Sequence, residues 1–223
     1  MKYLIAITFI LGIFNCKPKE TLSPAEVNLM DSLGFDKKIV AGIRKFTDAA
    51  LVQYVTADPG YMITSDDGRQ ETGLQKREGI SFQVSTSDLD NIVLGLKDDL
   101  RKLGYLIFVS ENGFDDPSTI SIIKSNDQFD IVRFQGTDGI NYEIENDEVI
   151  GKLMEWDAKY GIEIIGADYD WVEFTLKKLP QNITAFSEEV YEFCPDSVEQ
   201  GAGELSELEK LISEHRRLFL WWD

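Results

Sequence analysis

Residues 79–109 read GISFQVSTSDLDNIVLGLKDDLRKLGYLIFV. The opening GISFQV alternates apolar and polar side chains, which is the pattern of a half-buried strand. A helix is predicted next, because Ser85 to Asp88 offers capping side chains and the following apolar residues recur at helical spacing. Those apolar residues are Leu89, Ile92, Val93, Leu96, Leu100 and Leu103. Gly104 is placed to end the helix, and the apolar run Tyr105–Val109 predicts a second strand.

The same order of elements recurs toward the C-terminus. Strands are expected at Thr119–Lys124 and Phe129–Gln135, after a loop at Gly113–Pro117. A second set of elements then follows: a strand at Asn141–Ile144, a helix lined by Val149, Leu153, Trp156 and Tyr160 and ended by Gly161, and strands at Ile162–Ala167 and Trp171–Leu176. This recurrence predicts an α+β fold, in which duplicated strand–helix–strand–strand units form a largely antiparallel sheet with helices packed on one face.

The two ends of this domain contain further elements. Helices are expected at about Ile183–Phe193 and Glu204–Glu214, and Leu218–Trp222 is expected to be a final strand docked into the sheet. On the N-terminal side, Ser23-Pro24-Ala25-Glu26 is a capping box that begins a helix, which extends to about Leu33.

Residues 36–78 carry a weaker periodic signal. Strands are expected at Ala50–Thr56 and Tyr61–Ser65, a turn at Asp66–Gly68, and a polar loop at Gly68–Glu78. The expected division of the chain is therefore a signal peptide at 1–15, a tether at 16–23, an N-terminal region at 24–78 and an α+β domain at 79–223.

The chain begins MKYLIAITFILGIFNC. Lys2 is a short positive region, Leu4 to Phe14 is an apolar stretch too short to span a bilayer, and Cys16 stands where a cleavage site belongs. This pattern predicts a bacterial lipoprotein signal, with palmitate or a related acyl group on Cys16. The expected location is the cell envelope, on the periplasmic face or the outer membrane, with the lipid bilayer as partner. An uncleaved anchor helix and an ordinary signal peptide are the alternatives.

Composition excludes several classes of function. With 22 basic and 40 acidic residues, the formal net charge of −18 repels phosphates, so no nucleic-acid partner is expected. Divalent cations or a basic protein remain compatible with it, as does acidity that merely keeps a tethered protein soluble. The single histidine and two cysteines exclude a zinc site built on several His and Cys ligands. With Cys16 acylated, Cys194 has no partner for an intrachain disulfide.

Several short motifs occur in order along the second half of the chain. They are Thr137-Asp138-Gly139, Trp156-Asp157, Tyr160-Gly161, Gly166 to Glu173, Tyr191 to Asp196, Glu199-Gln200-Gly201 and Leu220 to Asp223. Together they resemble the DUF4253 family, a domain of unknown function found in many bacteria, over about residues 115–223. The resemblance implies a shared domain without implying a mechanism. Members of that family are often cytoplasmic, so a lipoprotein signal is a departure from it.

Acidic residues form the first candidate site: Asp157, Asp168, Asp170 and Glu173. Such carboxylates could hold a hard cation, or divide acid and base roles if a neighbouring tryptophan desolvates one of them. The alternative is turn chemistry, because Asp at a hairpin tip bonds its own backbone. Asp196 and Gln200 form a second candidate, as the polar rim of a pocket or as part of a capped join between two helices.

Three further features have an ordinary structural explanation. Cys194 could be a nucleophile with His215 as base, but Glu192 and Asp196 beside it and its place at a helix C-terminus favour a structural thiol. The tryptophans Trp156, Trp171, Trp221 and Trp222 could line a ligand site, although core packing is commoner. His215-Arg216-Arg217 is a small basic group that complements the end of its own helix.

Two functions from different classes fit these observations. The preferred one is a lipid-anchored, non-catalytic binding module that presents an acidic surface to a protein or small-molecule partner and needs no cofactor. An immunity-type role, in which the acidic surface neutralises a basic toxin, is one concrete version. The alternative is a hydrolase-like enzyme that uses Asp168, Asp170 and Glu173, with a divalent cation as a further option.

Overall fold

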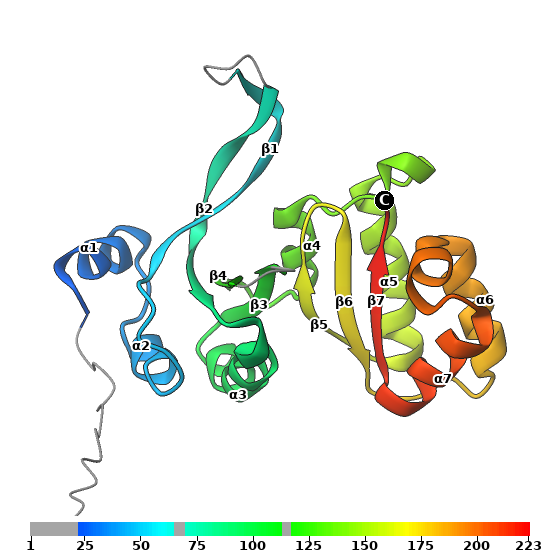
Figure 1. Ribbon diagram of the computed structural model, residues 1–223. Coiled ribbons are helices and arrows are strands. Elements are labelled where there is room, and N and C mark those ends of the chain that lie inside the picture. The colour runs from blue at the N-terminus through cyan, green and yellow to red at the C-terminus, as the bar shows by residue number, and fades with distance from the viewer. Residues whose placement is uncertain (1–21, 65–69, 113–116) are drawn as a thin grey trace, which may run out of the picture.

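The computed structural model describes residues 22–64, 70–112 and 117–223. A single seven-stranded sheet has the order β1-β2-β4-β3-β5-β6-β7 (Figure 1). Its strands are β1 Val52–Thr64, β2 Gln70–Val84, β3 Tyr105–Glu111, β4 Ser118–Lys124, β5 Ile162–Ala167, β6 Trp171–Leu176 and β7 Arg217–Trp221. Every neighbouring pair is antiparallel except β3 and β5, which are parallel. The expected α+β class with a largely antiparallel sheet is confirmed.

Helices cover both faces of the sheet, where the sequence led us to expect only one covered face. They are α1 Pro24–Leu33, α2 Lys38–Ile43, α3 Leu89–Lys102, α4 Phe129–Gln135, α5 Asn146–Tyr160, α6 Ile183–Phe193 and α7 Leu205–His215. One core packs α1 to α3 on the first face, and a second packs α4 to α7 on the other. Neighbouring residues of β3 serve the two cores in turn, Ile107 the first and Phe108 the second. Continuous apolar strands such as β3 therefore reflect burial on both faces.

Two predicted strands are wrong. Phe129–Gln135 is the helix α4, which the Asp127 carboxylate begins by accepting the Phe129 N–H (3.0 Å) and which Gly136 ends at a φ of 68°. Asn141–Ile144 is mostly a 3₁₀ turn, Ile140–Tyr142, closed by one bridge between Gly139 and Ile144. The repeated unit is therefore helix–strand–strand: α3-β3-β4 and α5-β5-β6. Leu103, expected on the buried face of α3, is 44% exposed because the helix ends at Lys102.

Much of residues 36–78, where the periodic signal is weak, belongs to a long hairpin arm made of β1 and β2 (Figure 1). Residues 70–78, predicted as a loop, belong to β2, and the boundary expected at Gly79 falls within that strand. The two short strands predicted on either side of Pro59 are one strand, β1, whose register shifts between Asp58 and Met62. Such a bulge accommodates the Pro-Gly pair inside a strand. The turn predicted at Asp66–Gly68 lies outside the described residues.

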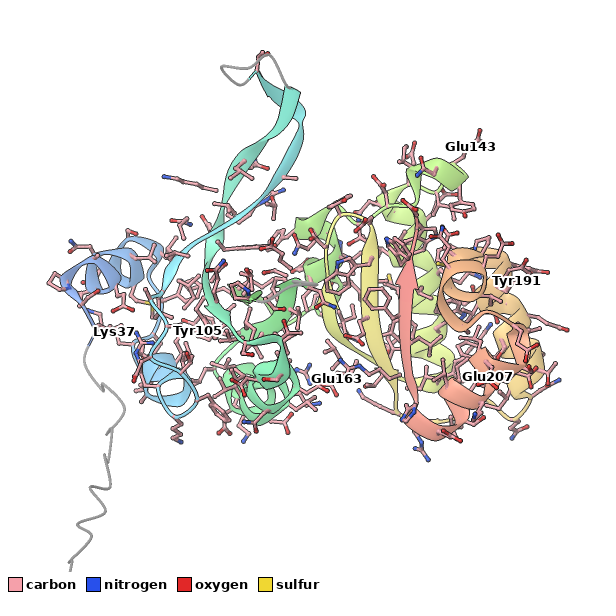
Figure 2. The ribbon with its side chains drawn as sticks, viewed as in Figure 1. Lys37, Tyr105, Glu143, Glu163, Tyr191 and Glu207 are labelled. Atoms are coloured by element: carbon pink, nitrogen blue, oxygen red, sulfur yellow. The ribbon has the colours of Figure 1, made fainter. Side chains whose placement is uncertain are left out.

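The N-terminal helix is fastened by a buried ion pair. The capping box between Ser23 and Glu26 is present, as predicted. The Glu26 carboxylate also accepts bonds from Arg44 Nη2 (2.6 Å) and from the backbone N–H of Leu51 (3.0 Å). Burial raises the pKa of Glu26, but these donors outweigh burial and hold the pKa at about 2. The pair therefore ties α1 to the start of β1. Tyr105, labelled in Figure 2, begins β3, and its hydroxyl accepts the N–H of Asp36 (2.8 Å) from the segment between α1 and α2.

The contact between β3 and β5 joins the two halves of the sheet. It consists of one paired position, Val109 with Gly166. A Cβ at Gly166 would lie 2.8 Å from the Val109 carbonyl oxygen and 2.9 Å from the Trp171 ring, so only glycine permits this approach. The buried side chain of Gln135 spans the contact, because its amide nitrogen donates to the carbonyls of Ser110 (2.9 Å) and Ala167 (2.8 Å). The contact between β3 and β5 is therefore short and close, and a side chain of α4 spans it.

We expect Gly166→Ala to destabilise the protein by about 1–3 kcal/mol, because the added methyl group meets backbone rather than a flexible side chain. Urea unfolding followed by circular dichroism measures the change. Gly151→Ala is the matched control: Gly151 is exposed on α5 with nothing near its Cβ position, so alanine should raise the free energy of unfolding by up to about 1 kcal/mol. Equal effects of the two substitutions would show that the junction is not tight.

Candidate functional site

The carboxyl ends of β3 and β5 lie side by side because the strands are parallel neighbours. Ser110 and Glu111 stand at the end of β3, and Asp168 follows β5 directly. Ligands of α/β sheets commonly bind beyond the carboxyl ends of adjacent parallel strands. We call the polar group at this position the strand-end site and define it as Tyr54, Ser110, Glu111, Asp168 and Asp170.

The turn between β5 and β6 fixes the backbone of Asp168. Its N–H donates to the Trp171 carbonyl (2.9 Å), and its own carbonyl accepts the Thr137 hydroxyl (2.6 Å). The carboxylate Oδ1 accepts the N–H of Tyr169 (2.8 Å). This is the Asx-type turn chemistry considered from the sequence. This one backbone donor offsets only part of the negative charge of the carboxylate, so the pKa of Asp168 depends on the groups around it.

Those surroundings disfavour the charged form of Asp168. Burial raises the pKa, the Tyr169 N–H lowers it, and the nearby negative charges of Asp170 and Glu111 raise it further, to about 6. Burial also raises the pKa of Asp170, against hydrogen bonds with the side chains of Tyr169 and Trp221. Within the described parts of the chain, neither carboxylate forms an ion pair with Lys or Arg. The site thus holds an excess of negative charge in a partly desolvated position.

Tyr54 brings a hydroxyl from β1 toward the same place. Its ring packs edge-on against Phe108, with 5.8 Å between ring centroids, and lies over Gly79. The side chain is 1% exposed, and its hydroxyl has no hydrogen-bond partner among the residues described. Burial raises the pKa of Tyr54, the positive charge of Arg77 lowers it, and the charge of Asp168 raises it. A buried hydroxyl left without a partner costs about 1–3 kcal/mol, so it marks a place where a ligand group could bind.

A row of hydroxyls extends from the strand-end site across the sheet. Ser121 Oγ lies 2.7 Å from both Ser81 Oγ and Ser110 Oγ, so three strands contribute one connected chain. Beside it is a hollow of about 510 Å³, whose polar lining comes from Gln53, Ser81, Gln83, Ser110, Glu111 and Thr119. Ser110 and Glu111 belong to both the hollow and the strand-end site.

The other predicted site residues have structural partners. Asp157 accepts the Ile162 N–H (2.7 Å) where α5 turns into β5. Glu173 makes two bonds to Arg217, of 2.6 and 2.9 Å. The six residues proposed from the sequence therefore do not converge on one point. Asp168 and Asp170 share the turn after β5, whereas Asp157 and Glu173 serve other contacts.

Asp196 and Gln200 lie together around the C-terminus. The buried Asp196 carboxylate accepts the amide of Gln200 (2.9 Å) and the backbone N–H of Asp223 (2.9 Å). Burial raises the pKa of Asp196, but the hydrogen bonds from Asp223, Tyr142 and Gln200 outweigh burial and lower the pKa below its usual value. This arrangement fastens the end of the chain to the turn that follows α6.

Cys194 and the tryptophans have mainly structural surroundings. The buried thiol of Cys194 donates to the Trp221 carbonyl (3.1 Å), and burial raises its pKa, which is unfavourable for a nucleophile. Trp156 is fully buried in the α4–α7 core, as core packing predicted. Trp171 belongs to the first core and stacks on Phe219, with 5.3 Å between ring centroids.

Residues 22–64, 70–112 and 117–223 contain neither a metal-binding cluster nor a membrane-spanning helix. In these ranges, no group of three or more His, Cys, Asp and Glu side chains gathers closely enough to hold a metal ion. No helix in them is long and apolar enough to cross a membrane.

Tyr54 and the serine row were missed by the sequence analysis. Tyr54 lies in residues 36–78, where no regular apolar period marks the elements. Ser81 belongs to a strand predicted correctly, but the pairing that brings it opposite Ser121 joins residues 40 positions apart. Only the pairing of β2 with β4 brings these hydroxyls together, and local spacing gives no signal of it.

Comparison with known proteins supports the expected resemblance. Residues 119–223 match the family described as Domain of unknown function (DUF4253). The match includes Asp168, Asp170 and the rest of the turn after β5. No curated protein and no solved structure matched the chain.

We expect Asp168→Asn to stabilise the protein above about pH 6 and to have little effect below about pH 4. Since the native pKa of about 6 lies above the usual 3.8, the ionised carboxylate opposes folding and the protonated one does not. The gain at about pH 8 should be about 1–3 kcal/mol. Urea unfolding across this pH range measures it. Asp98→Asn, which removes an exposed carboxylate from α3, is the control, and the account fails if the two variants behave alike.

Proposed function

We propose that this chain is a lipid-anchored, non-catalytic binding module whose strand-end site receives a cationic group of a partner. One observation carries the proposal: Asp168 is a desolvated carboxylate that opposes folding when ionised, beside two more carboxylates. A group that costs stability in the free protein is typical of a functional site. A bound ammonium or guanidinium group would supply the missing positive charge.

The partner's cation would meet several acceptors at once. Glu111, Asp168 and Asp170 supply negative charge, and the Tyr54 hydroxyl is free to accept an N–H that water does not reach. A guanidinium or ammonium group on a flexible stem can reach acceptors that are too far apart to share one metal ion. The geometry therefore favours an organic cation over a divalent metal.

Long-range charge supports the same class of partner. The formal net charge of −18 attracts basic molecules and raises their rate of association. A basic protein whose Lys or Arg side chain enters the strand-end site would use both effects. An immunity-type role, in which a basic toxin is neutralised, is one concrete version of such binding.

Anchoring by lipid rests on the N-terminal sequence. The short apolar stretch before Cys16 fits a lipoprotein signal, and two or three acyl chains would hold the mature protein at a membrane. The domain would then be displayed outside the cytosol on a short tether.

Acid–base catalysis is the second candidate function. Its support is the pKa of Asp168, which at about 6 places the group near the value that suits a general acid or base at neutral pH. In this version the neighbouring carboxylates orient water, and a divalent cation would have to draw them closer together than they lie in the free protein. Stabilisation of the protein by MgCl₂ or CaCl₂ that is lost in Asp168→Asn would favour it over simple binding.

A capped tri-arginine peptide tests the binding proposal. Isothermal titration at about pH 7.5 and physiological salt should show binding to the wild-type protein, and the uncharged tri-citrulline peptide of the same shape should not bind. Asp168→Asn should weaken the affinity at least tenfold, because it removes the central acceptor. The affinity should also fall toward about pH 5, as Asp168 takes up a proton.

Asp98→Asn is the charge-matched control for this titration. It removes one negative charge from the exposed face of α3, so general attraction predicts the same loss as for Asp168→Asn. The proposal requires that Asp98→Asn bind like the wild type. Equal losses would assign the binding to net charge alone.

Metabolic labelling with palmitate tests the anchor. The full-length protein expressed in a bacterium should incorporate the label, Cys16→Ser should abolish it, and Cys194→Ser should retain it because Cys194 is buried in the α4–α7 core. Labelling that survives Cys16→Ser would refute lipidation at that residue.

A further inference from the structure

The strand β7 forms one edge of the sheet, and its hydrogen bonds show which way each residue's backbone faces. The Arg216 carbonyl accepts the Leu176 N–H (2.7 Å), and the Trp222 N–H donates to the Asp170 carbonyl (3.0 Å), so these two residues face β6. Backbone direction alternates along a strand that pairs antiparallel. Arg217, Phe219 and Trp221 therefore turn their N–H and C=O groups away from the sheet.

The two ends of this outer edge differ. At the upper end the Trp221 carbonyl accepts the Cys194 thiol (3.1 Å), and the Asp223 N–H donates to Asp196 (2.9 Å), so the segment after α6 covers the edge. Below it, no hydrogen bond within the described ranges engages the outward backbone groups of Phe219. An unpaired strand edge of this kind is a template for another strand.

A groove of about 310 Å³ follows this open edge and extends to both sides of β7. Leu208, Leu211 and Leu218 line it on the side of α7, which lies next to β7 in Figure 1. Phe219 and Trp221 line it on the opposite side. Leu211 and Phe219 are 42% and 39% exposed, which is high for large apolar side chains.

We propose that this groove receives an extended segment of a partner protein, which adds to β7 as an eighth strand. The outward N–H and C=O of Phe219 offer one donor and one acceptor at the spacing at which a further strand pairs. Side chains alternate across a strand, so a segment with alternating apolar residues would place these against Leu211 and its intervening side chains beside Phe219. The groove lies on β7 and meets the strand-end site only through Trp221, whose side chain bonds Asp170, and pairing with the edge at Phe219 does not depend on the proposed function.

Charge selects the kind of segment. At the lower end of the groove, the exposed Arg216 side chain reaches the Lys177 carbonyl and forms no ion pair within the described ranges. An acidic residue at the end of the incoming segment would complement this guanidinium group. A second copy of this chain is disfavoured as the occupant, since each copy carries a net charge of −18.

A synthetic peptide, Glu-Val-Thr-Val-Thr-Val-Glu, tests the proposal because it alternates apolar residues and presents an acidic end in either direction. In ¹H–¹⁵N NMR with amide exchange, saturating peptide should slow exchange of the Phe219 N–H at least tenfold. A peptide that is N-methylated at every residue should not bind, because it lacks the backbone donors on both edges.

Variants locate the binding on the groove. Leu211→Glu should weaken the peptide at least tenfold, whereas Leu94→Glu, which changes a leucine of similar exposure on α3, should leave its affinity unchanged. Three results would each overturn the proposal: unchanged exchange at Phe219, equal binding of the N-methylated peptide, or a concentration-dependent dimer of the protein alone that occupies the edge.

Discussion

The parallel strands β3 and β5 approach each other closely only because residue 166 is glycine. One paired position joins them, and the Gln135 amide spans the contact by donating to a carbonyl on each side. Three of the other strand pairs are antiparallel hairpins, which local sequence can specify, whereas β2 with β4 and β6 with β7 are antiparallel pairs of strands separated by helices in the chain. The junction between β3 and β5 instead joins two halves of the sheet through residues that lie far apart in the sequence. It also places the ends of β3 and β5 together, and with them the side chains of Glu111 and Asp168.

That placement explains the chemistry of the strand-end site. Asp168 begins the turn after β5. Protein groups replace much of the water around its carboxylate, and two other carboxylates repel its negative charge. Tyr54 adds a hydroxyl that the described protein leaves unpaired. Neither feature stabilises the fold, and each would be satisfied by a ligand that brings positive charge and N–H donors. The proposed binding of a cationic group rests on these two features.

The local signals in the sequence were sufficient for many elements. The strands β5 and β6 and the helix α6 begin and end at the predicted residues, because Gly161, the Asp168–Asp170 turn and Asn182 mark their limits. The helix α4 was mistaken for a strand, since seven residues are too few to separate the two apolar periods. Glu173 seemed available as a site residue, but Arg217, its partner, lies 44 positions away. Tyr54 was not predicted as a site residue for the same reason, because Phe108 and Asp168, which lie near it, are far away in the sequence.

The pKa of Asp168 connects the junction, the site and the proposed binding. Carbon-13 NMR can follow the Asp168 side-chain carboxyl directly while the pH of the native protein is varied. The account predicts a midpoint at about 6, well above that of an exposed aspartate. A midpoint near 4 would mean that the carboxylate is well solvated, and would contradict the desolvated anion on which the account depends.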